Sequence, residues 1–150
     1  MRLLIQRVLQ ASVTIDGRQT AAIGQGLLVL IGVEENDNQS DIDYLVPKLL
    51  GLRIFSDSEG KMNLNVQQVQ GQLLLVSQFT LHASTKKGNR PSFIKAAKPD
   101  LAESLYKQFI AQVETQSGQA PQTGTFAADM KIALVNDGPV TIMMDSKEKE

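Results

Sequence analysis

The chain has 150 residues and a mass of 16.4 kDa, a length typical of one globular domain. Fifteen Lys and Arg residues nearly balance sixteen Asp and Glu residues, so any contact with nucleic acid must come from a local basic patch. Because cysteine is absent, the sequence excludes disulfides, a thiolate nucleophile and a zinc site built on sulfur. A single histidine, His82, excludes a multi-histidine metal site, and we expect neither a metal nor a cofactor.

The hydropathy of the chain favours a cytoplasmic protein without a membrane span. The longest apolar run, Leu27–Ile31, reaches only Gly26–Val33 with its glycines, far short of the ~20 residues that cross a bilayer. The first residues carry charge at Arg2 and Arg7, too early for a signal peptide.

The first third of the chain predicts β structure. Val13 and Ile15 alternate with polar neighbours, and Asp16-Gly17 is a typical hairpin turn. The continuous apolar run Gly26–Val33 indicates a strand that is buried on both faces. The predicted strands here are Leu3–Leu9, Ser12–Asp16, Gln19–Ile23 and Gly26–Val33.

A helix follows, because apolar residues recur at helical spacing from Ile42 to Leu50. Ser40 or Asp41 is the expected N-cap. Pro47 lies inside the apolar stripe and should kink or shorten this helix, because proline lacks the backbone N–H.

The remaining elements complete a layered α/β domain. A second helix is expected over Pro99–Gln116, with Pro99 in its first turn. The charged tail, residues 146–150, is expected to be solvated and disordered after a single domain over residues 1–145. The further predicted strands are Leu52–Phe55, Gln72–Phe79, Lys131–Val135 and Val140–Met144.

The segment Ser77–Leu81 ends a predicted buried strand with two hydroxyls around an amide. Ends of strands are where α/β sheets place ligands, so Ser77 to Thr80 are candidate substrate contacts. The alternative, which spacing alone favours, is a strand capped by ordinary polar residues. In an extended segment Thr80 and His82 would share a face, which makes His82 a candidate base. The alternative for a lone histidine on a loop is a surface residue.

A basic stretch follows that strand. It holds five positive charges within thirteen residues and no acid, and Gly88 and Pro91 indicate a loop. Such a loop is either simply solvated or a patch that contacts phosphates of nucleic acid. Its basic residues are Lys86, Lys87, Arg90, Lys95 and Lys98.

The segment Asn136–Thr141 is the most informative one. Its Asn, Asp and Gly residues are typical of a hairpin turn, with Pro139 at the start of an edge strand. The alternative is a cis Gly138–Pro139 bond, which would aim the flanking carbonyls in a direction that a trans turn cannot reach.

These segments together resemble the D-aminoacyl-tRNA deacylase family. The three signature segments are Ser77–Leu81, Gly88–Phe93 and Asn136–Thr141, and their order matches that family. The resemblance runs from about Met1 to Asp145 and also includes Leu4–Val8, Arg53–Asp57, Lys61–Val66 and Phe126–Met130.

The resemblance implies a fold of mixed, mostly antiparallel β-sheets that form a barrel-like core, with two main helices packed on one side in three layers. It also implies a homodimer that hydrolyses the ester between a D-amino acid and the 3′ end of tRNA, and that removes glycine mischarged on tRNA for alanine. No DNA or membrane partner is expected.

The resemblance further assigns roles to residues. A cis Gly138–Pro139 dipeptide of one subunit would enter the partner's pocket and exclude L side chains, held in place by Arg7. Catalytic contacts would come from Ser77, Gln78, Phe79 and Thr80, whereas Lys86, Lys87 and Arg90 would contact tRNA.

A chain with one histidine and no cysteine has little with which to activate a nucleophile of its own. The 2′-OH of the tRNA, next to the ester, can instead assist water, while the protein positions the ester and stabilises the oxyanion. Thr80 as a covalent nucleophile is the competing mechanism. Two alternatives to an enzyme stay open here: a nucleic-acid-binding module without hydrolysis and an inactive oligomeric scaffold.

Overall fold

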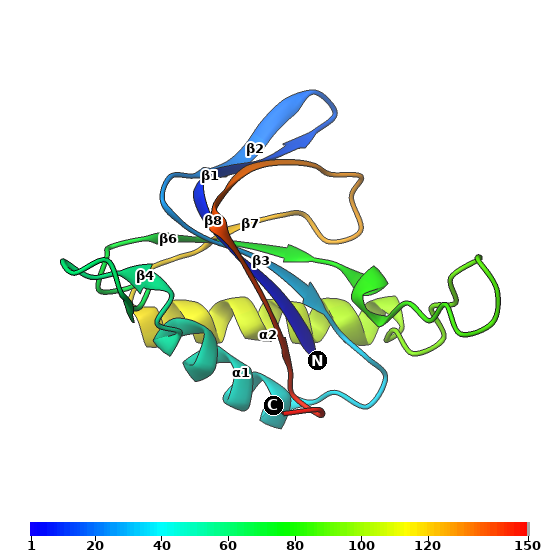
Figure 1. Ribbon diagram of the computed structural model, residues 1–150. Helices are drawn as coiled ribbons and strands as arrows, with labels where there is room; N and C mark the ends of the chain where they lie inside the picture. The colour runs from blue at the N-terminus through cyan, green and yellow to red at the C-terminus, as the bar shows by residue number, and fades with distance from the viewer. Residues whose placement is uncertain (150) are drawn as a thin grey trace.

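The computed structural model describes residues 1–149, whose centre is one strongly curved six-stranded sheet (Figure 1). The strand order is β2-β1-β3-β6-β7, and β8 pairs with β1. β1 is antiparallel to its three neighbours β2, β3 and β8, whereas β6 is parallel to both of its neighbours, β3 and β7. The sheet is therefore mixed, as predicted. The strands are β1 (Arg2–Ile15), β2 (Arg18–Ile23), β3 (Gly26–Gly32), β6 (Gln72–Ser77), β7 (Gln122–Thr123) and β8 (Lys131–Asp145).

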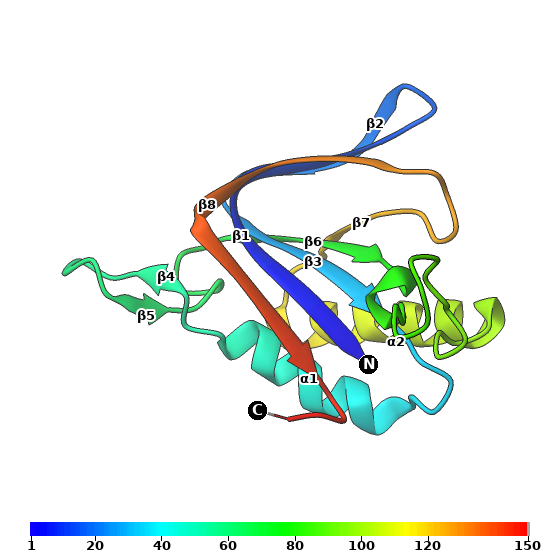
Figure 2. The ribbon, with the colours of Figure 1, turned by 45° about the vertical axis from the view of Figure 1, so that its right-hand side comes forward.

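The long strand β1 bends the sheet into a nearly closed barrel. One edge of β1 pairs with β3 through residues 2–8 and with β2 through residues 11–15, while its other edge pairs with β8 along nearly its whole length. Register shifts interrupt the β1–β8 ladder on both sides of Val8. Such bulges increase twist locally, and Figure 2 shows β8 turning sharply at the matching point.

The bend divides the core into two clusters. Leu3 and Ile5 of β1 pack in a cluster with both helices, whereas Val8, Ala11 and Val13 belong to the cluster enclosed by the curled sheet. Side chains alternate between the faces of a strand, so Ile5 and Val8, three residues apart, lie on opposite faces. Val8 and Ala11 are also three residues apart but share a cluster, which follows from the register shift between Val8 and Gln10.

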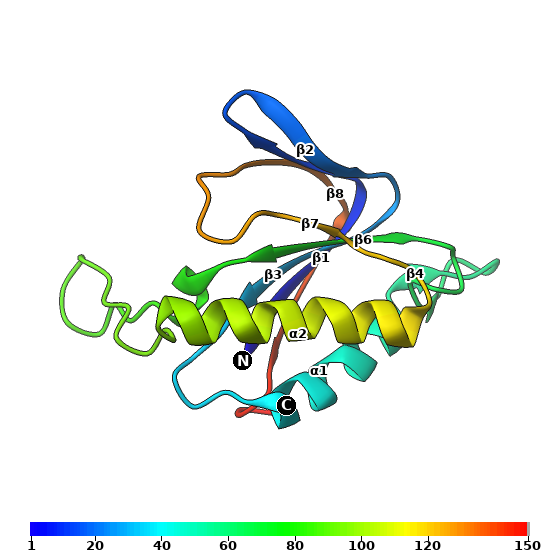
Figure 3. The same ribbon diagram turned by 180° about the vertical axis from the view of Figure 1, so that it is seen from behind.

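Two helices, α1 (Gln39–Gly51) and α2 (Pro99–Ser117), cover one face of the sheet, as Figure 3 shows from behind. The predicted barrel-like core with two helices on one side is therefore confirmed. Pro99 lies at the start of α2 as predicted, and Gly118 ends that helix in the left-handed region with φ 70°.

The start of α1 differs from the prediction. Its N-cap is Asn38, and Asp41 is the third helical residue, whose carboxylate accepts a hydrogen bond from the Asn38 backbone N–H at 2.8 Å. Pro47 does not shorten α1, which continues through Gly51.

The predicted strand boundaries need four corrections. Residues 3–9 and 12–16 form the single strand β1, and residues 131–135 and 140–144 form the single strand β8, so Asn136–Pro139 is not a hairpin turn. The strand predicted from Leu52 is only β4 (Phe55–Ser56), which pairs with the unpredicted strand β5 (Met62–Leu64). The strand predicted to Phe79 ends at Ser77, and a 3-10 turn, η1 (Phe79–His82), follows it.

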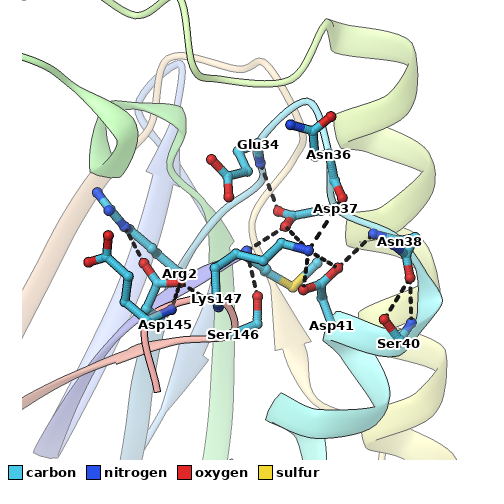
Figure 4. A network of polar contacts seen from close by, with 12 residues as sticks. Arg2, Glu34, Asn36, Asp37, Asn38, Ser40, Asp41, Asp145, Ser146 and Lys147 are labelled. Carbon is cyan, nitrogen blue, oxygen red and sulfur yellow. Dashed lines mark hydrogen bonds and ion pairs between the residues drawn. The ribbon is translucent and has the colours of Figure 1, made fainter. Parts of the chain in front are cut away.

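The first residues of the predicted tail fold back against α1 (Figure 4), whereas residues 147–149 are exposed. Ser146 is only 6% exposed, and its hydroxyl oxygen lies 2.8 Å from the Met1 amino nitrogen, which also forms an ion pair with Asp37 at 2.6 Å. Lys147 forms an ion pair with Asp41 at 2.8 Å. Glu150 of the predicted tail lies outside the described residues.

No helix among residues 1–149 is both long and apolar enough to cross a membrane.

Candidate active site

The candidate site begins where β6 ends. β6 is buried between its two parallel neighbours, and its last residue, Ser77, is paired with Ile31 of β3. The next backbone amide, that of Gln78, donates to the Ile31 carbonyl at 2.7 Å. The chain then turns sharply into η1, which leaves Phe79 and Thr80 exposed.

A pocket of about 660 Å³ opens beside this strand end. Apolar and small side chains form most of its wall, with Ser77, Gln78 and Asp129 as polar groups. The pocket is lined by Ile31, Val33, Val76, Ser77, Gln78, Phe79, Phe93, Ala96, Ala97, Pro99, Ala102, Phe126, Ala127, Ala128, Asp129, Met130 and Ile132.

The mouth of the pocket has an aromatic rim. Phe79 and Phe93 meet edge to face, with ring centroids 5.0 Å apart, and Phe79 remains 56% exposed. An aromatic surface of this kind can stack on a base or a ring of a ligand. Three of the four predicted catalytic residues thus line one pocket, namely Ser77, Gln78 and Phe79.

Thr80 does not line the pocket. Its hydroxyl accepts a hydrogen bond from the side-chain amide of Gln78 and is exposed to solvent. An amide donor cannot remove the hydroxyl proton, so nothing in this arrangement activates Thr80 as a nucleophile.

The predicted pairing of Thr80 with His82 rests on an extended segment, and that segment is a 3-10 turn. His82 is 2% exposed, and neither of its ring nitrogens has a hydrogen-bond partner among the described residues. The interpretation of His82 as a surface residue is therefore wrong. Because His82 is buried and does not line the pocket, it has no contact with the solvent there.

The Gly138–Pro139 peptide bond is cis, and Gly138 has a φ of 126°, which favours glycine. A Cβ atom on Gly138 would lie 2.7 Å from Val140 Cγ2 and 3.1 Å from a guanidinium nitrogen of Arg7. Both Gly138 and Pro139 are exposed.

Arg7 binds the residue that precedes this dipeptide. Its Nε donates to the Asp137 carbonyl at 3.2 Å and lies 3.0 Å from the Asp137 carboxylate, while its Nη1 donates to the Ile54 carbonyl. Arg7 is 8% exposed, so its partners satisfy a buried charge. The structure thus brings Arg7 and Gly138 together.

The structure does not bring Gly138 near the pocket of its own chain. Asn136 pairs with Val8, Val8 with Gly26, and Gly26 with Gln72 at the start of β6. Ser77 lies five residues further along β6, which is roughly 17 Å at 3.3 Å per residue. Neither Gly138 nor Pro139 lines the pocket.

The predicted tRNA contacts lie on the loop that joins η1 to α2. Lys86, Lys87 and Arg90 are all exposed, and a bridge between Ser84 and Ser92 closes the loop beneath them. Because Phe93 follows this bridge and lines the pocket, the basic side chains lie on the loop that leads to the pocket mouth.

Sequence reasoning missed part of the pocket wall. Ala96 and Ala97 lie before α2, and the segment Phe126–Met130 joins β7 to β8. Small residues in connecting segments have no periodicity that indicates a site. Only the family resemblance gave a signal for Phe126–Met130.

Within residues 1–149, no three His, Asp or Glu side chains gather to hold a metal ion.

A family model described as D-Tyr-tRNA(Tyr) deacylase matches residues 4–145. The chain belongs to this family. A D-aminoacyl-tRNA deacylase of Flavobacterium johnsoniae is 59% identical over 150 residues, and one of Parabacteroides distasonis is also 59% identical, each aligned over the full length of both chains. The family consists of hydrolases that act on aminoacyl-tRNA, and this chain is an enzyme of that class.

Solved structures agree with the fold. The structure titled "c-Myc DNA Unwinding Element Binding Protein" has a TM-score of 0.92 at 40% identity and is matched over 97% of this chain and 98% of its own. A probable eukaryotic D-amino acid tRNA deacylase has a TM-score of 0.81 at 20% identity, over 95% and 97% of the two chains, which supports the fold alone.

Proposed function

We propose that the pocket beside Ser77–Phe79 hydrolyses the ester between a D-amino acid and the 3′ end of tRNA, and also removes glycine mischarged on tRNA for alanine. The observation that carries this proposal is the combination of an apolar pocket with a distant, exposed Gly138–Pro139 dipeptide. Hydrolysis of D-aminoacyl-tRNA serves translation quality control.

The mechanism requires little from the protein's side chains. Ser77, Gln78 and Phe79 line the pocket, and Thr80 hydrogen-bonds Gln78 at its margin. We infer that backbone amides near the end of β6 stabilise the developing oxyanion. The 2′-OH of the terminal ribose assists the attacking water, because no base contacts the Thr80 hydroxyl within the described chain.

Selection of handedness is proposed to need a second subunit. Because Asn136, two residues before Gly138, aligns with the start of β6, and neither Gly138 nor Pro139 lines the pocket at the end of β6, we infer that the dipeptide serves a pocket in another copy of the chain. Arg7 would hold the dipeptide rigid, and its carbonyls would face the substrate ammonium group. A rigid wall rejects an L side chain by a clash, which discriminates better than weaker attraction.

The tRNA is proposed to lie along the basic loop. Lys86, Lys87 and Arg90 would contact phosphates and position the 3′ end at the pocket, so binding should weaken as salt rises. Because charged tRNA is the substrate, we place the enzyme in the cytoplasm.

The decisive assay compares ester loss from D-tyrosyl-tRNA and L-tyrosyl-tRNA with purified protein. We expect rapid loss of the D-ester and no loss of the L-ester above buffer. Retention of both esters together with tRNA binding at low salt would favour the non-catalytic nucleic-acid-binding module. Equal loss of both esters would contradict selection by handedness.

A second substrate tests the role of the 2′-OH. D-tyrosyl-tRNA that ends in 2′-deoxyadenosine should be hydrolysed at least tenfold more slowly, since the assisting hydroxyl is missing. An unchanged rate would rule out assistance by the substrate.

A further inference from the structure

Arg2, at the start of β1, reaches from the end of β8 to the turn that follows β6. Its Nε donates to the Asp145 carboxylate at 2.7 Å, and its Nη1 donates to the Leu81 carbonyl at 3.1 Å. Figure 4 shows the Arg2 and Asp145 side chains in contact. The planar guanidinium makes both bonds at once from two of its nitrogens, whereas a lysine ammonium would have to make both from one nitrogen at the end of a flexible stem.

The carbonyl that Arg2 binds belongs to η1, the turn that carries Phe79 and Thr80. Within η1 the backbone bonds are local, from Leu81 to Gln78 at 3.3 Å and from Ala83 to Thr80 at 3.0 Å. Among the hydrogen bonds of residues 1–149, Arg2 provides the only side-chain donor from another element to the backbone of this turn.

η1 also packs closely against β3. A Cβ atom on Gly32 would lie 2.9 Å from Leu81 Cβ and 3.1 Å from the Gln78 carbonyl oxygen. Close packing against Gly32 and the hydrogen bond from Arg2 thus both hold the turn. If the Leu81 carbonyl is released, only this packing and the local backbone hydrogen bonds of the turn fix its orientation.

We propose that Arg2 is a positioning residue for ester hydrolysis, which rests on the function proposed above. Its guanidinium, oriented by Asp145, holds the Leu81 carbonyl and so fixes η1, with Phe79 at the rim of the pocket and Thr80 beside Gln78. Arg2 itself does not line the pocket.

The pair that orients Arg2 is charged over the neutral range. Burial raises the pKa of Asp145, but the hydrogen bond from Arg2 and the backbone amides of Lys147 and Glu148 outweigh it and lower that pKa. The same hydrogen bond raises the pKa of Arg2. The Asp145 carboxylate is therefore available to hold the guanidinium in one orientation.

The kinetic test compares Arg2→Gln and Arg2→Lys with wild type on D-tyrosyl-tRNA. Both variants should lower kcat at least tenfold with less than about threefold change in KM, because a displaced turn misplaces the reacting groups more than it weakens binding. Arg2→Lys keeps a positive charge beside Asp145, so its Tm should stay near that of wild type. Arg18→Gln, an exposed change on β2, is the matched control and should behave as wild type.

A wild-type kcat in either Arg2 variant would overturn the proposal, as would a full rescue by Arg2→Lys.

A second readout does not depend on turnover. Hydrogen exchange of the Ala83 amide, which closes η1 onto Thr80, should accelerate at least fivefold in Arg2→Lys, whereas the Gln78 amide bonded to β3 should not change. Unchanged exchange at Ala83 would contradict the role of Arg2 alone. Absence of hydrolysis by the wild-type protein would count against the proposed function alone.

Discussion

At the scale of single residues, the site is notable for how little reactive chemistry its side chains offer. Thr80 accepts a hydrogen bond from an amide, and His82 is buried and does not line the pocket. The groups that carry the proposed reaction are therefore main-chain amides and the substrate's own hydroxyl. Two substitutions test whether the side chains of Thr80 and His82 take part in the reaction.

Thr80→Ala should retain substantial turnover of D-tyrosyl-tRNA, within about tenfold of wild type. Loss of a covalent nucleophile costs about 10⁶-fold in kcat in a serine protease, so the two mechanisms predict very different rates. Single-turnover measurement of ester loss distinguishes them. Complete loss of activity in a folded Thr80→Ala protein would revive the nucleophile.

His82→Leu should leave hydrolysis near the wild-type rate and change the free energy of unfolding by less than about 1 kcal/mol. Neither ring nitrogen of His82 has a partner to lose among the described residues, and an apolar side chain of similar volume suits the buried position. The readouts are kcat and the urea midpoint. A large loss of kcat without a loss of stability would make His82 a catalytic group.

At the scale of elements, the start of α1 is an electrostatic junction between both ends of the chain. The Asp41 carboxylate accepts the hydrogen bond from the N-cap residue Asn38 and forms an ion pair with Lys147 of the tail. Burial raises the pKa of Asp41, but hydrogen bonds from Lys147, Ser146 and Asn38 outweigh it, so that pKa is lowered below its usual value of 3.8. The ionised Asp41 therefore stabilises the folded state above about pH 4, and this contribution is lost as the pH falls through the lowered pKa.

Asp41→Asn should consequently lower stability at pH 7 and make it fall less steeply than wild type between about pH 4 and pH 2. Urea unfolding at a series of pH values measures both effects. Asp43→Asn, an exposed change on the same helix, is the control and should reproduce the wild-type pH dependence. Parallel curves for Asp41→Asn and wild type would contradict the assigned junction.

Elements with strong periodicity were predictable, whereas their joins were not. The apolar spacing of α1 and α2 and the runs of β3 and β6 gave the right element types. The turn residues Asn136–Pro139 favoured a hairpin, but the β1 ladder keeps β8 continuous through a bulge, so tertiary pairing overrode local turn chemistry. The tail lacked apolar residues, yet Lys147 forms an ion pair with Asp41 of α1, and such charge pairing leaves no periodic signal.

At the scale of the whole molecule, the β-sheet register separates the two halves of the proposed site. The Gly138–Pro139 dipeptide, next to Arg7, lies near the level of the start of β6, whereas the pocket opens at the end of β6. The sequence motifs predicted both the dipeptide and the pocket residues. Their separation follows only from the pairing of β8, β1, β3 and β6. Under the function proposed above, a second copy of the chain would complete the site.

Mixed dimers test this central claim most directly. Gly138→Leu should disrupt the Gly138–Pro139 dipeptide that forms the wall, and Ala102→Phe should fill the pocket. Each homodimer should therefore lose hydrolysis of D-tyrosyl-tRNA. A dimer of one Gly138→Leu chain and one Ala102→Phe chain should regain about half of the wild-type activity, because one intact pocket meets one intact wall. Mixed dimers that form but remain as inactive as both parents would contradict the shared site.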